Sequence, residues 1–205
     1  MRLISARLAW HDAFYTPWDS VTSHSIELAK LGQWVQTSSR GNGLGRIAHQ
    51  ALAGKVQHAI SLLPVALQLW GHHLYAPVID SRTSNAWEEA AVDLLESQFN
   101  AYLRERGQQF ATVKRAVLGF VARGVLYRYR VMVQGGMGAN PDPLPSPREF
   151  RAWLAGWHGV QLDRRNWSRE WGWVVQEMFR ACDRLDAKAL WTVAGVLEGE
   201  KALAA

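Results

Sequence analysis

The sequence has a single cysteine and no long apolar run. One cysteine, Cys182, cannot form an internal disulfide bond and excludes any CxxC zinc site. So little cysteine suits a protein of the reducing cytoplasm. No window approaches the roughly 18 apolar residues needed to cross a bilayer, and residues 1–12 lack the pattern of a signal peptide. We therefore expect a cytoplasmic protein without a membrane span.

Motifs of catalysis are also missing. The chain contains no HExxH, GxSxG, paired DxD or Walker pattern. The glycine-rich segment 37–46 lacks the GK[ST] ending of a phosphate-binding loop, which favours a plain connection. His72 and His73 are adjacent, so they point to different faces of a helix and have no third ligand nearby. We expect neither an enzyme nor a bound cofactor or metal ion.

Acidic residues are absent between Glu105 and Asp142. Six basic residues fall in that stretch: Arg106, Lys114, Arg115, Arg123, Arg128 and Arg130. The segment from Arg104 to Arg184 holds fourteen Lys and Arg against seven Asp and Glu, although the whole chain has a net charge of only +5. Positive charge concentrated in one half indicates an acidic partner. A merely solvated basic face is the alternative.

Hydrophobic residues and tryptophan are plentiful. Hydrophobic residues make up 48% of the chain, enough for a buried core, and eleven residues are tryptophan. Large indoles either anchor a helical core or form a surface for a partner. The sequence leaves both interpretations open.

Hydrophobic periodicity predicts helices and no hairpin. After irregular residues 1–20, we expect helices over 22–36, 47–74, 86–106, 109–133, 147–155, 167–185 and 187–203. Pro64 should kink or divide the second helix, and Gly107 should end the third, which Ser84 or Asn85 would cap. The fold class is therefore all-α. The loop 76–85 is the expected boundary between an N-terminal helical region (1–80) and a DNA-binding region (81–205).

Residues 146–149, Ser-Pro-Arg-Glu, give a strong signal for the start of a helix. Ser146 is placed to cap, proline occupies the first helical position, and Glu149 completes a capping box. Apolar residues of this short helix can dock it to the core while Arg148 and Arg151 stay outside. A helix N-terminus favours phosphate, and arginine can read guanine edges. With helix 109–133 it predicts a split helix-turn-helix in which helix 147–155 enters the major groove.

Further basic residues are candidates for phosphate contacts. Lys114 and Arg115 belong to helix 109–133, while Arg164, Arg165 and Arg169 crowd the start of helix 167–185. Cations at a helix start oppose its dipole, and a bound anion would relieve that conflict. Each phosphate contact would steepen the salt dependence of binding.

Three segments together resemble a known family. Residues 113–130, 150–152 (Phe-Arg-Ala) and 167–169 (Trp-Ser-Arg) resemble, in order and spacing, the Q antitermination proteins of lambdoid phages, including Q-like antiterminators of bacterial chromosomes. The likeness covers about residues 90–200. It implies binding to double-stranded DNA beside a promoter and loading onto bacterial RNA polymerase, with its sigma factor, at a paused complex. Suppression of termination by narrowing of the RNA exit channel would follow.

One departure from that family concerns zinc. Lambda Q carries two CxxC pairs between its DNA-binding helices, whereas this chain has the cysteine-free loop 134–145. We therefore expect no zinc, and the loop itself becomes a candidate contact with DNA or polymerase. The N-terminal half, with its aromatic residues, would hold polymerase.

Three other functions remain as alternatives. An ordinary helix-turn-helix repressor or activator would bind its operator as a dimer and never leave it. A nucleic-acid-processing enzyme would need a metal-binding carboxylate pair. A protein-interaction module with an incidental basic face would bind polymerase without salt-dependent affinity for DNA.

Overall fold

The computed structural model describes residues 3–14, 42–78, 80–134 and 140–203 of the chain. Over those ranges the regular structure is entirely helical, without strands, which confirms the all-α class. The expected helix over 22–36 and the first part of the glycine-rich segment 37–46 lie outside the described residues.

The N-terminal part begins with helix α1 (Leu3–Phe14), where irregular structure was expected. Its buried residues Ala6, Trp10 and Ala13 recur every three or four positions, and this stripe, packed on other helices, stabilises the helix. Helices α3 (Asn42–Ser61) and α4 (Val65–Tyr75) follow. The break at Pro64 is confirmed, but residues 42–46, expected in a loop, are helical.

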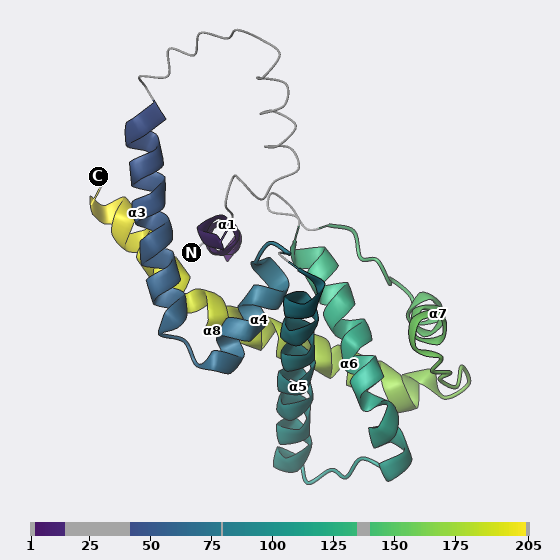
Figure 1. Cartoon of the computed structure of the whole chain (residues 1–205). Coiled ribbons are helices and arrows are strands. Elements are labelled where there is room, and N and C mark those ends of the chain that lie inside the picture. Colours follow the sequence, from purple (N-terminus) through teal and green to yellow (C-terminus); the bar gives the residue numbers. More distant parts are fainter. Residues whose placement is uncertain (1–2, 15–41, 79, 135–139, 204–205) are drawn as a thin grey trace, which may run out of the picture.

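Helices α5 (Ser81–Glu105) and α6 (Thr112–Val133) form an antiparallel pair (Figure 1). The expected cap of α5 at Ser84 or Asn85 is wrong. Asp80 caps the helix instead, since its carboxylate accepts hydrogen bonds from the Thr83 amide (2.8 Å) and hydroxyl (2.7 Å). The prediction for Gly107 is confirmed, because its φ of 61° gives the left-handed turn that follows the helix.

Helix α7 (Pro147–His158) starts with the expected capping box. The Ser146 hydroxyl accepts from the Glu149 amide (3.3 Å), and the Glu149 carboxylate accepts from the Ser146 amide (3.0 Å). The predicted end of this helix at residue 155 is wrong. The helix runs on to Gly159, whose φ of 66° allows the Val160 amide to donate back to the Leu154 carbonyl (3.3 Å).

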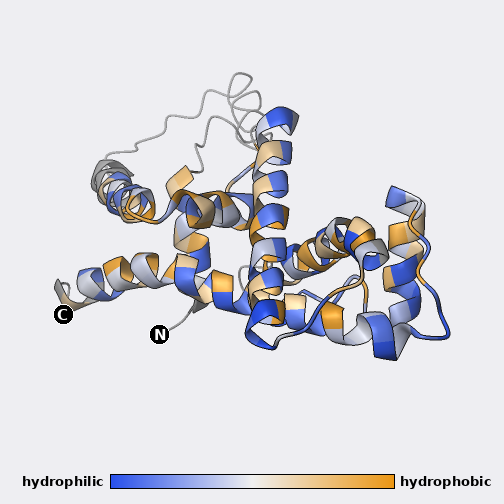
Figure 2. Ribbon diagram, turned by 90° about the horizontal axis from the view of Figure 1, so that it is seen from below, coloured by the Kyte–Doolittle hydropathy of each residue, from blue (hydrophilic) through white to orange (hydrophobic). Residues whose placement is uncertain are grey.

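The C-terminal part is one long helix rather than two. A π-helical turn, η2 (Ser168–Gly172), leads directly into α8 (Trp173–Leu203), so the expected break near residue 186 is wrong. Figure 1 shows α8 crossing the whole molecule. Its first half packs on α5 and α6, and its second half packs on α1 and α3. Hydrophobic residues from all these helices belong to one continuous core, while hydrophilic residues cover the outer sides of the helices (Figure 2).

Asp186 lies at the junction of α1, α4, α6 and α8 and is only 1% exposed. Its carboxylate accepts hydrogen bonds from Arg7 (2.6 Å), Tyr75 (2.5 Å) and Tyr129 (3.1 Å). Burial, and then the negative charge of Asp186, raise the pKa of both tyrosines, which stay neutral donors. Four helices therefore share one satisfied buried carboxylate.

Candidate nucleic-acid interface

Helix α7 is docked on α6 by aromatic side chains. Phe150 lies against Gly124, where an added methyl group would come within 2.8 Å of the ring. Trp153 stacks on Tyr127 with ring centres 5.1 Å apart and an angle of 18° between the planes. Because these contacts use one side of α7, the opposite side is free.

Beyond Arg148, the free side of α7 carries small residues. Arg148, Ala152, Ala155 and Gly156 are exposed along it. Small residues let the backbone of a helix come close to another surface, and a helix of this diameter fits the roughly 12 Å width of the major groove. The alanines were not predicted as part of the site, although their spacing from Arg148 by four and seven residues indicates a shared helix face.

The two arginines predicted to face DNA lie on the first turns of α7. Arg148 is exposed and has no ion pair with any described residue. The Arg151 side chain is half-buried, and its Nε donates to the Pro147 carbonyl (3.1 Å). The acidic neighbour Glu149 is turned back onto Ser146 and also accepts from its hydroxyl (2.8 Å). The start of α7 thus presents the positive charges of Arg148 and Arg151, while the Glu149 carboxylate is engaged in the capping box.

A second basic group precedes α8. Arg164, Arg165 and Arg169 are all exposed. Asp163 accepts from the Arg165 amide (2.8 Å), which shapes the turn, and Arg169 donates to the Asn166 side chain (3.4 Å). This group is connected to α7 through the core, where the Trp167 and Phe150 rings lie 5.8 Å apart.

The remaining two predicted residues lie at the start of α6. Lys114 forms an ion pair with Glu170 of η2 (3.3 Å), which joins the start of α6 to the second basic group. Arg115 is exposed and unpaired among the described residues. The structure therefore brings Lys114 to the turn that bears Arg169, while Arg148 and Arg151 form a separate pair on α7.

Helix α6 has no acidic residue of its own, but two of its arginines are paired with acids from elsewhere. Arg123 pairs with Glu88 (3.1 Å) and Glu89 of α5, and Arg128 binds Asp142 with two contacts of 2.9 Å from its Nε. The acids come from other elements, so counting charges along one helix cannot detect them. Less of α6 is available to phosphate than its sequence suggests, because two of its arginines hold the fold together.

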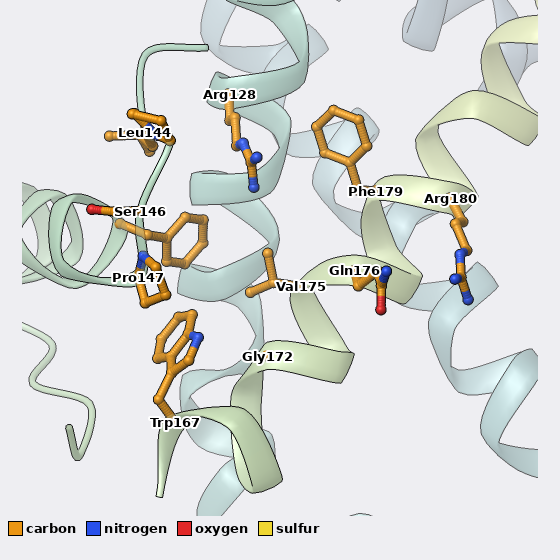
Figure 3. A pocket seen from close by; sticks show the side chains of 12 residues that line it. Arg128, Leu144, Ser146, Pro147, Trp167, Gly172, Val175, Gln176, Phe179 and Arg180 are labelled. Atoms are coloured by element: carbon orange, nitrogen blue, oxygen red, sulfur yellow. The ribbon is translucent and has the colours of Figure 1, made fainter. Parts of the chain in front are cut away.

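A cavity of about 440 Å³ lies where the start of α7 meets α6 and α8. Figure 3 shows its apolar floor, which includes Leu144, Trp167 and Val175, with Arg128 and Arg180 near its edge. Ser146 and Pro147, the cap and first residue of α7, line the same cavity. The cavity therefore runs from the start of α7 to the side of α8.

Comparison with known proteins gives no relative. No family model matches the chain, and no curated protein or solved structure matches it. Within the described ranges, no group of three or more His, Cys, Asp or Glu side chains is placed to hold a metal ion. No helix in the part of the chain that the structure describes is long and apolar enough to span a bilayer. Function must therefore be argued from the surfaces themselves.

Proposed function

We propose that the protein is a DNA-binding transcription antitermination factor that loads onto RNA polymerase paused near a promoter. The observation that carries the proposal is the free side of α7, with Arg148 and Arg151 on its first turns and small residues beyond them. In this proposal α6 and α7 are the two helices of a split helix-turn-helix, and α7 enters the major groove.

The arrangement of charge supports contact with a duplex. Arg148 and Arg151 stand at a helix N-terminus, where the dipole also attracts phosphate. Arg164, Arg165, Arg169 and Arg115 provide positive charge near α7 and at the start of α6 that can neutralise backbone phosphates, whereas Lys114 first has to leave Glu170. Base contacts are thus assigned to α7, and phosphate contacts to both groups.

Loading onto polymerase is supported by the resemblance of three segments to Q proteins and by an apolar corner in the N-terminal half. Leu62 and Val65 are 70% and 68% exposed on either side of Pro64, where α3 meets α4. Exposed apolar side chains that lie close together can form part of a protein-binding surface. This corner is our candidate contact with polymerase.

Binding to duplex DNA is tested with arginine variants. Arg148→Ala and Arg151→Ala should each weaken binding to the upstream promoter DNA by about 5- to 150-fold, the effect of one good base contact. Arg104→Ala removes an exposed arginine from α5 and serves as the matched control. Specific affinity that survives both α7 substitutions would remove α7 as the recognition helix.

Antitermination is tested by single-round transcription with bacterial RNA polymerase across a terminator. We expect read-through that requires both the protein and the upstream DNA element. Unchanged termination by a protein that still binds the DNA would replace the proposal with an ordinary repressor or activator.

A further inference from the structure

One face of α8 carries a row of exposed basic residues beside an exposed tryptophan. Arg180, Arg184, Lys188 and Trp191 follow one another at intervals of three or four residues, and all four are exposed. That spacing places them on a single face of the helix. We name these four residues the α8 stripe.

The indole of Trp191 is open to solvent. It is 71% exposed, while the neighbouring Leu190 and Val193 fill the core. One turn before and one turn after it, the exposed residues are Ala187, Lys188 and Gly195, and only Lys188 has a side chain long enough to approach the ring. A flat group can therefore reach the ring from the solvent.

The charge of the α8 stripe is positive and confined to the side of Trp191 nearer to the start of the helix. Arg180 and Arg184 share one carboxylate, the buried Glu177, at 3.4 and 2.9 Å. Lys188 has no ion pair with any described residue. On the other side of Trp191, the same face continues to the exposed Glu198, where the basic row ends.

The α8 stripe begins at the cavity below α7. Arg180 lines that cavity together with Ser146 and Pro147, as Figure 3 shows. The stripe therefore runs from this cavity along α8 to Trp191.

We propose that the α8 stripe binds single-stranded nucleic acid, with a base stacked on Trp191 and phosphates on Arg184 and Lys188. Aromatic rings beside cationic side chains are the usual means of holding unpaired strands. A duplex offers no free base face to the indole. Lysine is depleted at the centres of protein–protein interfaces, so Lys188 one turn from the exposed indole favours a nucleic acid over a protein partner. This site is separate from the proposed duplex site on α7 and does not depend on it.

The test is the affinity of the full-length protein for dye-labelled 12-nucleotide oligothymidine and oligouridine, measured by fluorescence anisotropy. Trp191→Ala should weaken binding at least about fivefold, the lower end of what one stacked base contributes. Lys188→Gln should reduce the slope of log affinity against log salt by about 0.7, one phosphate contact on a single strand. Trp157→Ala, at a tryptophan of α7 that is 76% exposed, is the matched control and should leave the affinity unchanged.

Circular dichroism shows whether each variant is folded, and the surface position of Trp191 makes loss of folding unexpected. The proposal is overturned if the wild-type protein does not bind either oligonucleotide at low salt. It is also overturned if Trp191→Ala and Trp157→Ala have equal effects. Arg148→Ala with Arg151→Ala should abolish specific duplex binding and spare oligonucleotide binding, so failure of the duplex site and failure of the stripe are distinguishable.

Discussion

Replacing Asp186 by asparagine should destabilise the protein strongly. The change keeps the shape of the side chain but removes the negative charge that pairs with Arg7 and accepts hydrogen bonds from Tyr75 and Tyr129. Removing one partner of a buried ion pair costs about 3–5 kcal/mol, because the other charge is left uncompensated. Arg7 is 22% exposed, so water relieves part of that cost and the lower value, about 3 kcal/mol, applies.

The free energy of unfolding can be measured by urea denaturation, and the expected loss corresponds to a fall in Tm of about 6–12 °C for a chain of this size. Glu198→Gln is the control, since it removes an exposed carboxylate from the same helix and should change stability by less than about 0.5 kcal/mol. A double-mutant cycle with Arg7→Met should show coupling between residues 7 and 186. If Asp186→Asn lowers the free energy of unfolding by less than about 1 kcal/mol, the buried carboxylate does not hold the four helices together.

Three further predictions concern α7 and the buried histidine. Gly124→Ala should push Phe150 outward and weaken both stability and duplex binding. Gly156→Ala, where the new methyl group meets no neighbour, should stabilise α7 by about 0.5–1 kcal/mol. Thermal melts should therefore shift Tm in opposite directions for the two variants, and DNA titrations should show weaker binding by Gly124→Ala. Ser146→Ala should cost about 1 kcal/mol through loss of the capping box, and an unchanged urea midpoint would contradict this. Burial, aided by Arg130, lowers the pKa of His73 to about 3, below its unfolded value of 6.5. The unfolded chain therefore takes up the proton first, and about 2 kcal/mol of stability should disappear between pH 8 and pH 5 in wild type relative to His73→Met.

Local signals in the sequence predicted the elements whose ends are set by neighbouring residues. The capping box at Ser146, the break at Pro64 and the left-handed turn at Gly107 each depend on the chemistry of a few adjacent positions, and all three are present. The all-α class followed from the 3.6-residue period of the apolar positions in the same way.

Features set by distant parts of the chain were not predictable in this way. Helix α1 has only 12 residues, too few to be stable alone, and is held by packing on α3 and α8. The sequence pattern places residue 186 between two helices. In the structure it belongs to α8, because Arg7, Tyr75 and Tyr129 bind its buried carboxylate. The basic run of α6 looked unpaired because its acids lie in α5 and after residue 140. The placement of Lys114 beside Glu170 was likewise invisible, since 56 positions separate them.

The contact between Arg7 and Asp186 spans 179 positions of the chain, which has a consequence for biosynthesis. A ribosome adding about 5–20 residues per second needs about 10–40 seconds to travel from one to the other. During that interval α1 has emerged without α8, one of the helices that bury it, and the part of its apolar stripe that α8 covers is open to chaperones or to neighbouring chains. Nascent chains stalled before α8 should therefore leave α1 accessible to protease, and completion of α8 should protect it in a single late step.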